Sequence, residues 1–378
     1  MKVNIKDLKK LSSKLGIAIE KSALNPKSSW IELETLEDRV VFKVSNFNYF
    51  LKTYIEYTSE EKEDLHVTIS AETFIPLISK LDVDEIEMQE KLNYLILTTD
   101  KSSYTFPIIK ELGNTKLLDT INFNATSNKI EMSGLDLASV ANVNTKGLID
   151  AMFSRDIQRF IYIDNLGAIT FTENIYVNDF RVPSNSEFKL LLTNQQATLL
   201  KVFEEDEKVE LELEQAVSFN SCETTSNKVK LSSYKSELIL VTQDSDVVDK
   251  FPSIRLRALV ENPLNTHIEI DKKVLDKALA RLMVFDKKFD ITVLNYSKLV
   301  FKDNYLELIS IKNKNKEVVD YKSATNIVPH EAVIRFADLV KQLKAVTNPV
   351  IDISYGDKPA LVLNSNVKQV IPEIQLED

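Results

Sequence analysis

Three passages of the chain share one pattern of apolar positions. Each begins with apolar residues three and four apart, the spacing of a helix face, and ends with apolar residues two apart, the spacing of a strand. The passages start at Ala71, Asn194 and Phe336. When they are aligned, the following positions coincide: Leu77, Leu199 and Leu339, then Leu81, Phe203 and Leu343, then Ile86, Val209 and Ile351. The pattern predicts a helix, a polar break and a strand, repeated three times.

Another strand-and-helix unit precedes each passage. It is clear in the first block, where Val3 and Ile5 come before a stripe of leucines, and in the last block, where Ile268 and Ile270 do the same. The middle version, 129–143, is weaker. Short alternating runs follow each passage and predict antiparallel meanders. Each block therefore predicts an α+β domain with two helices packed on antiparallel sheet. Turn-forming stretches predict boundaries that give domains 1–116, 117–262 and 263–378.

Composition restricts the class of protein. The 378 residues are 44% hydrophobic, enough for two or three domains with substantial cores. The chain lacks the apolar runs of a membrane span or secretory signal, so we expect a cytoplasmic protein. It has a single cysteine, Cys222, and three scattered histidines, so we expect no disulfide, metal or other cofactor. The six glycines allow neither a P-loop nor a dinucleotide-binding loop.

The positive charge lies on the predicted helices, although the net charge is −10. Lys6, Lys10 and Lys14 recur every four residues opposite the leucines of the first helix, and Lys273, Lys277 and Arg281 repeat that spacing in the third block. Further candidates on the helices are Lys80, Lys146, Lys201, Lys341 and Lys344. These side chains are either a solvated helix face or a surface that binds phosphates without reading bases.

Several stretches, in their order and spacing, resemble the bacterial DNA polymerase III β sliding clamp family. These are "VNDFRV" (177–182), "DKFPSIRLRALV" (249–260), "LDKALARLMVF" (275–285) and "KQVIPEIQ" (368–375). The resemblance covers essentially the whole chain as a pattern. It implies three similar domains and a head-to-tail homodimer that closes into a ring around duplex DNA, with the basic helices facing the DNA. It also implies a non-enzymatic processivity factor with a DNA polymerase and a clamp loader ATPase as partners.

The resemblance further implies two protein-binding surfaces. One is a pocket for short peptides of partner proteins, with these residues as its walls: Val177, Phe180, Arg181, Val182, Pro252, Leu256, Val370, Ile371, Pro372 and Ile374. The other is the dimer interface, formed by Tyr104 and Phe106 of one subunit and by Val284 and Phe285 of the next. The four interface residues could equally belong to the core, and the alternative for Val370 and Ile371 is a last core strand.

The chain departs from the family pattern at both ends of the implied pocket. Asp179 and Phe180 stand where the family has Gly and His, and Glu373, Ile374 and Gln375 stand where it has Met, Arg and Leu. We therefore expect an altered peptide preference and hypothesise a clamp encoded by a phage or mobile element. The alternatives are a three-domain scaffold that forms no ring, and a hydrolase built on "NDFR" (178–181). The hydrolase has no evident nucleophile and base.

Overall fold

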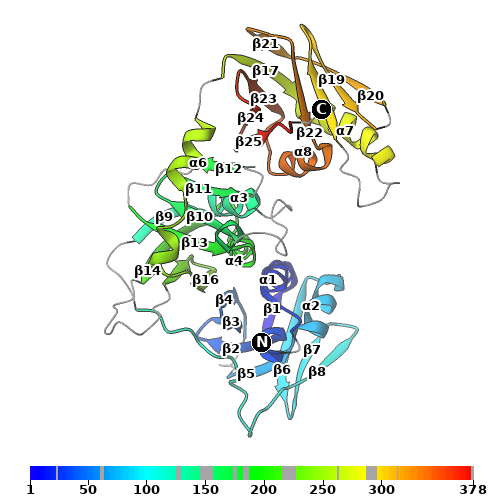
Figure 1. The fold of residues 1–378 in the computed structure, drawn as a ribbon. Coiled ribbons are helices and arrows are strands. Elements are labelled where there is room, and N and C mark those ends of the chain that lie inside the picture. Colours follow the sequence, from blue (N-terminus) through cyan, green and yellow to red (C-terminus); the bar gives the residue numbers. More distant parts are fainter. Residues whose placement is uncertain are drawn as a thin grey trace. The chain divides into compact units, whose positions relative to one another are not determined.

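A computed structural model describes residues 1–22, 24–59, 64–124, 129–144, 156–172, 177–181, 187–214, 227–261, 264–286, 296–312 and 314–375. The chain divides into two compact units, and their helices and strands are labelled in Figure 1. Unit 1 consists of Met1–Ala138 and Thr198–Asp244. Unit 2 consists of Ser139–Ala197 and Ser245–Asp378. Each unit is described by itself below.

The described elements follow one another in three similar series, which we call the first, middle and last copies. The first copy contains β1 (Lys2–Asn4), α1 (Ile5–Ala18), η1 (Pro26–Ser29), β2 (Trp30–Leu36), β3 (Arg39–Asn46), β4 (Tyr49–Glu56), β5 (His66–Ser70), α2 (Ala71–Lys80), β6 (Glu85–Lys91), β7 (Tyr94–Thr98) and β8 (Ser103–Pro107). The middle copy contains β9 (Lys129–Ser133), α3 (Gly134–Asn144), η2 (Asp156–Arg159), β10 (Phe160–Asp164), β11 (Gly167–Phe171), β12 (Val177–Arg181), β13 (Lys189–Thr193), α4 (Asn194–Leu199), η3 (Leu200–Val202), β14 (Lys208–Glu214), β15 (Lys228–Ser232) and β16 (Ser236–Val241).

The last copy follows two short helices, α5 (Ser245–Val248) and α6 (Ser253–Val260). It contains β17 (Thr266–Asp271), α7 (Lys272–Asp286), β18 (Ser297–Phe301), β19 (Tyr305–Ser310), β20 (Lys316–Asp320), β21 (Ser323–Thr325), β22 (His330–Ile334), α8 (Phe336–Leu343), β23 (Val350–Tyr355), β24 (Ala360–Asn364) and β25 (Lys368–Pro372). The order strand, helix, four strands, helix, three strands is common to the copies, apart from the added β21. The predicted α+β repeat is confirmed. The domain boundaries stay a prediction.

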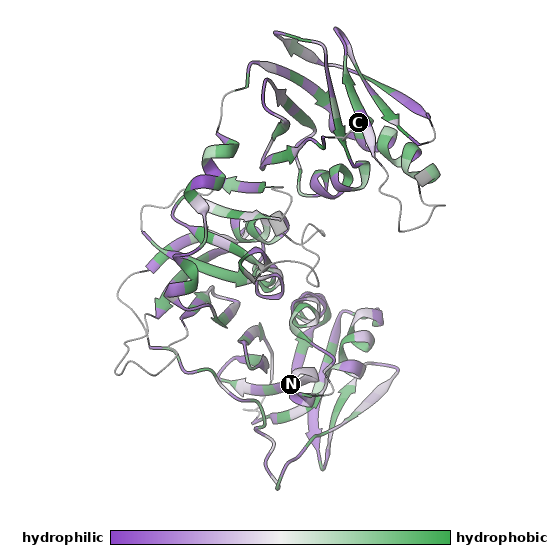
Figure 2. Ribbon diagram, viewed as in Figure 1, coloured by the Kyte–Doolittle hydropathy of each residue, from purple (hydrophilic) through white to green (hydrophobic). Residues whose placement is uncertain are grey.

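The first helix illustrates why the sequence folds this way. Asn4 caps α1, because its side chain accepts a hydrogen bond of 2.9 Å from the backbone nitrogen of Lys6. Leu8, Leu11 and Leu15 then fall on one face and are buried, as their spacing predicted. Asp271 caps α7 in the same way, accepting from the backbone nitrogens of Lys273 and Val274. Figure 2 shows the alternation of hydrophobic and hydrophilic residues along the strands.

Two sheets of described strands form unit 1. One has the order β5-β2-β3-β4-β16-β15-β14-β9, and the other has the order β1-β6-β7-β8. The first sheet crosses from the first copy to the middle copy where β4 pairs with β16, from Ser236 opposite Thr53 to Leu240 opposite Tyr49. The first and middle copies are therefore joined by backbone hydrogen bonds between their strands.

Unit 2 repeats this arrangement. Its described strands form one sheet of order β13-β10-β11-β12-β25-β24-β23-β17-β21 and another of order β20-β19-β18-β22. The larger sheet crosses between copies where β12 pairs with β25, with Val177 opposite Val370. A buried amide network reinforces this junction, since the Gln369 side chain donates to Asn178 Oδ1 over 2.7 Å and to Gln342 Oε1 over 2.7 Å. In both units, the fourth strand of one copy pairs with the last strand of the next.

Candidate functional site

The basic residues predicted to face DNA lie mostly on helices that pack in pairs. In unit 1, α1 packs against α2, and Lys6, Lys10 and Lys80 are exposed on them. In unit 2, α7 packs against α8, and Lys273, Lys277, Arg281 and Lys341 are exposed, as is Lys344 just after α8. Lys201 is half-buried on η3, and Lys146 lies outside the described residues. Each helix pair thus carries a group of exposed cations.

Lys14 differs from the prediction. Its side chain is only 11% exposed, and its Nζ lies 3.3 Å from a carboxylate oxygen of Glu204 and 3.2 Å from one of Glu207. An amine buried between two carboxylates is not free to bind a phosphate. If Lys14 moved away, the buried carboxylate of Glu207 would lose its ion pair, which is unfavourable. Lys14 therefore joins α1 to the middle copy and does not belong to the exposed ridge.

Arg281 is exposed but engaged. Its guanidinium donates two hydrogen bonds to the Glu317 carboxylate on β20, over 2.7 and 2.6 Å. Hydrogen bonding to this carboxylate raises the pKa of Arg281 above its ordinary value. The helix α7 is thereby tied to the edge of its sheet, and Lys273 and Lys277 are left as the cations of α7 that have no ion pair in the described part of the chain.

The predicted peptide pocket lies within unit 2, where α6, β12 and β25 meet. Val177, Leu256 and Val370 come together in one apolar cluster and are covered, with 0%, 5% and 4% of their surface exposed. Ile371 is buried in a different cluster, the core of the last copy. Phe180, Arg181, Pro252, Pro372 and Ile374 are half-buried, whereas Val182 lies outside the described residues. The partly exposed residues are therefore the ones that a peptide could reach first.

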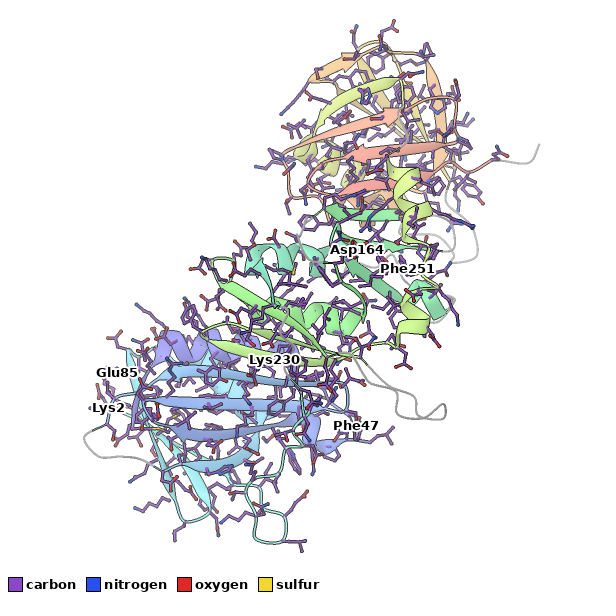
Figure 3. The ribbon with its side chains drawn as sticks, turned by 90° about the vertical axis from the view of Figure 1, so that its left-hand side faces the viewer. Lys2, Phe47, Glu85, Asp164, Lys230 and Phe251 are labelled. Carbon is purple, nitrogen blue, oxygen red and sulfur yellow. The ribbon has the colours of Figure 1, made fainter. Side chains whose placement is uncertain are left out.

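Two further contacts of this region could not be read from the sequence. Phe251 stacks on Tyr162, with ring centroids 4.9 Å apart and planes inclined by 10°, and contacts Phe171 edge-on. Arg257 is buried and donates to both carboxylate oxygens of Asp164, over 2.5 and 2.8 Å. Figure 3 labels Asp164 and Phe251 in this part of unit 2. Both contacts join residues far apart in the sequence, so spacing could not reveal them.

Electrostatics fix α6 against the sheet. Burial alone would lower the pKa of Arg257, but its hydrogen bonds and proximity to Asp164 and Asp179 raise it. Arg181 continues the network, donating to Asp179 over 2.6 Å and to Glu261 over 2.7 Å. Arg257 and Asp179 are buried and paired with each other, and each also has a second charged partner. The network therefore holds the α6 residues at a defined position beside β12.

The C-terminal strand ends beside a histidine. His330 Nε2 lies 2.8 Å from Glu373 Oε1, and the backbone nitrogen of Ile374 donates to Val333 over 2.8 Å. Burial raises the pKa of the Glu373 carboxyl above its ordinary value, against the opposing effect of His330. These contacts fix the path of residues 372–374 along β22.

The predicted interface residues lie at two open sheet edges, one in each unit. In unit 1, β8 is an edge strand. Phe106 on it is only 4% exposed and packs edge-on against Phe74, so it belongs to the core, whereas Tyr104 is half-buried. In unit 2, β20 is an edge strand and α7 packs beside it, with Val284 60% and Phe285 51% exposed. Val318 on β20 is 47% exposed and was not predicted.

Known proteins resemble this chain weakly in sequence. No family model matches the chain. The beta sliding clamp of Helicobacter pylori (strain J99) is 29% identical over 110 residues, a stretch that spans 29% of this chain and 29% of that relative. None of the helices in the described part of the chain is long and apolar enough to cross a membrane.

Solved structures match over nearly the whole chain. The beta subunit of DNA polymerase from Streptococcus pyogenes has a TM-score of 0.76 at 16% identity, covering 99% of both chains. The beta subunit of DNA polymerase III from Thermotoga maritima has a TM-score of 0.75 at 13% identity, covering 100% of this chain and 99% of that one. The H. pylori beta clamp bound to a DNA ligase peptide has a TM-score of 0.69 at 15% identity, covering 99% and 100%. The chain thus has the fold of the bacterial β sliding clamps.

Proposed function

We propose that this chain is a DNA sliding clamp, a processivity factor that encircles duplex DNA and tethers a DNA polymerase and other partners. The observation that carries the proposal is the repeated junction between copies. The fourth strand of the first copy, β4, pairs with the last strand of the middle copy, β16, and β12 pairs with β25 in the same way. One strand of each kind is left over, β20 in the last copy and β8 in the first.

The leftover strands supply a head-to-tail dimer contact. A third junction of the same kind would pair β20 of one molecule with β8 of another. Two such contacts close a ring if the rotation between subunits is right, and the same contact extends into a filament if it is not. The exposed Val284, Phe285 and Val318 beside β20 provide apolar surface for that contact. An open, apolar sheet edge is otherwise a site of aggregation.

Within the proposed ring, the helices contact DNA through phosphates. Lysines on helices act as point charges and carry no sequence code, which suits a protein that slides. Lys6, Lys10 and Lys80, together with Lys273, Lys277, Lys341 and Lys344, are the exposed candidates. We keep the domains as 1–116, 117–262 and 263–378. Topology supplies retention in this proposal, and weak contacts permit movement.

The partner site of the proposed clamp is the region around α6, β12 and β25. Its partly exposed residues, Phe180, Arg181, Pro252, Pro372 and Ile374, combine apolar surface with one cation. This suits a short extended peptide with a Leu or Phe anchor. A polymerase and a clamp loader are the proposed partners. Such a protein would act on the DNA of the cytoplasm and nucleoid.

The protein itself would make or break no bond. A Ser, His and Asp grouping does occur on the last copy, but Ser354 Oγ and Asp352 Oδ2 both approach Nδ1 of His267, at 2.9 and 3.3 Å. A catalytic triad needs the serine and the carboxylate on opposite ring nitrogens. Since the sequence allows no P-loop, the energy for opening the ring would come from a separate loader ATPase.

Solution mass by light scattering tests the ring proposal. A dimeric mass at micromolar protein concentration is expected, because the two open edges in each chain can form two junctions. A monomer over the same range would favour the alternative, a three-domain scaffold that does not form a ring.

A further inference from the structure

Unit 1 contains a second candidate binding site, a cavity of about 240 Å³ where the first and middle copies meet. One wall is the face of α1 that bears Asp7, Lys10 and Leu11. The opposite wall is the end of β4, with Tyr54 and Ile55. The cavity is separate from the pocket region of unit 2, because every residue lining it belongs to unit 1.

A cluster of lysines on a single carboxylate sets the electrostatics of this cavity. The Glu204 carboxylate lies 3.3 Å from Lys14 Nζ, 3.2 Å from Lys235 Nζ and 3.9 Å from Lys10 Nζ. Burial raises the pKa of Glu204, but Lys14 and Lys235 together lower it by more, so the net shift is downward. Lys14 is also paired with Glu207, but Lys10 and Lys235 share only the Glu204 carboxylate among the ion pairs of the described residues, so donor positions of these two ammonium groups remain for a ligand.

The cations at the mouth are the accessible ones. The Lys10 side chain is 63% exposed, and the Arg39 side chain is 45% exposed, with its own ion pair to Asp38 long at 3.8 Å. Lys235 is 34% exposed and lies over the ring of Tyr234, 5.1 Å from its centroid. Among the described residues, the ion pairs of Lys10 and Arg39 are both close to 4 Å long, so a carboxylate entering the cavity could bind these cations without displacing a short contact.

The acidic lining residues decide between two kinds of ligand. Asp7 and Glu56 also line the cavity. A nucleic acid backbone presents a negative charge at every phosphate and would be repelled by both. An extended peptide presents N–H donors as well as carbonyl acceptors. Asp7 and Glu56 can therefore accept from a peptide backbone while the cations bind its acidic side chain.

The size and apolar lining indicate what else the ligand carries. A cavity of about 150 Å³ holds a benzene-sized ring, so the present one has room for an aromatic or branched side chain beside a polar group. Leu11 and Ile55 supply buried apolar surface, and Tyr54 and Tyr234 supply rings against which such a side chain could pack. The cavity is too small for a folded element of a partner.

We propose that this cavity binds a short segment of a partner protein in which an acidic residue adjoins an aromatic residue. Arg39 and Lys235 bind the acidic side chain, and the aromatic side chain packs between Leu11, Ile55 and the two tyrosines. The site is distinct from the peptide pocket of the proposed clamp function and requires neither the ring nor DNA. Each protomer would then hold two partner segments at once.

The test uses the full-length protein and two blocked dipeptides, acetyl-Asp-Phe-amide and acetyl-Lys-Phe-amide, titrated by saturation-transfer difference NMR. We expect the Asp peptide to bind about tenfold more tightly than the Lys peptide, because charge-assisted hydrogen bonds are worth that much. Arg39→Ala and Lys235→Ala should each weaken the Asp peptide by about tenfold. Lys6→Ala, on the same helix but outside the cavity, and Ile374→Ala, in unit 2, should leave it unchanged.

Several results would overturn the proposal. Equal affinity for the two peptides would do so. Loss of peptide binding in Ile374→Ala, together with unchanged binding in Arg39→Ala, would do so as well. An oligothymidylate that binds the wild-type protein in place of the Asp peptide, and that itself no longer binds Arg39→Ala, would indicate a nucleic acid site. Arg39 is largely exposed, so its alanine variant keeps the test valid if Lys235→Ala unfolds, which thermal unfolding would reveal. Failure here would leave the clamp proposal standing, because that proposal rests on solution mass and DNA retention.

Discussion

Lys52 on β4 lies directly opposite Glu237 on β16, and its Nζ donates a hydrogen bond of 2.9 Å to the Glu237 carboxylate. Lys230 Nζ lies 3.2 Å from the other carboxylate oxygen. Burial raises the pKa of Glu237, but the two lysines outweigh it, so the pKa is lower than the ordinary value. The pairing of the first and middle copies therefore has an ionic lock in addition to its backbone hydrogen bonds.

Replacing this carboxylate should weaken unit 1. Glu237→Gln is expected to lower the free energy of unfolding by about 1–2 kcal/mol at pH 7, since it removes charge-assisted hydrogen bonds. Because the folded pKa lies below the ordinary value of 4.5, the stabilisation is present above pH 4.5 and is lost as the pH falls through the folded pKa. Urea unfolding at several pH values measures it, with Glu90→Gln, at an exposed position of β6, as the control. A pH-independent difference would contradict the assignment.

Proline on an open edge should dissociate the proposed dimer. Backbone bonds between Ile108 and Asn93 and between Thr99 and Ser102 fix the alternation along β8, so the Thr105 N–H points away from β7 toward the free edge. Thr105→Pro removes that donor without removing a bond of its own sheet. Light scattering should give a monomeric mass, whereas Thr105→Ala should stay dimeric. A dimeric proline variant would mean that β8 is not the interface.

Val318→Pro is the matching variant on the other edge. Backbone hydrogen bonds from Ser310 to Asn315 and from Tyr321 to Asn304 fix which residues of β20 bond to β19. In this alternation the Val318 N–H points away from β19. It should give the same monomeric mass. Only an effect from both edges supports the pairing of β8 with β20.

Charge reversal on α7 should weaken binding to DNA. Lys273→Glu with Lys277→Glu is expected to reduce the slope of log affinity against log salt by about 0.9 for each phosphate that the variant no longer neutralises. Binding to a short linear duplex, measured by fluorescence anisotropy across a salt series, gives that slope. Lys302→Glu with Lys358→Glu, at two exposed loop positions of the same copy, changes the net charge by the same amount and should leave the slope intact. An equal effect from this control would mean that only the net charge matters.

The pocket region of unit 2 should prefer apolar anchors. Phe180→Ala and Ile374→Ala are each expected to weaken a blocked Ser-Leu-Ser-Leu-Phe peptide by about tenfold, because each removes a partly exposed apolar wall. Ile254→Ala removes a side chain that is 85% exposed on α6 and should have little effect. Calorimetric titration measures the affinities. Unchanged affinity in both wall variants would place the peptide elsewhere.

The repeat could be predicted because it depends on local spacing. The helical stripe of Leu8, Leu11 and Leu15 and the strand pattern around Ile86 record which faces are buried, and the structure buries them. The clamp fold followed from the order of such units and from short resembling stretches. The likeness to solved structures confirms that fold.

The roles of individual residues were harder to predict from the sequence, because they depend on contacts between distant segments. Lys14 has the spacing of an exposed ridge, yet Glu207, far along the chain, buries it. Phe106 has the position of an edge residue, but Phe74 covers it. Arg257 and Asp164 carry no local signal of their pairing. A periodicity shows that a side chain faces one way but not what the rest of the fold brings there.

Retention on DNA circles tests the central claim most directly. The protein, introduced onto a nicked circular duplex, is separated from free protein by gel filtration at a salt concentration that abolishes binding to short linear duplexes. The circle is then cut once with a restriction enzyme. A ring predicts that protein remains on the circle and is released after cutting, because only topology holds it. Equal retention on circular and cut DNA, or none on either, would contradict the sliding clamp.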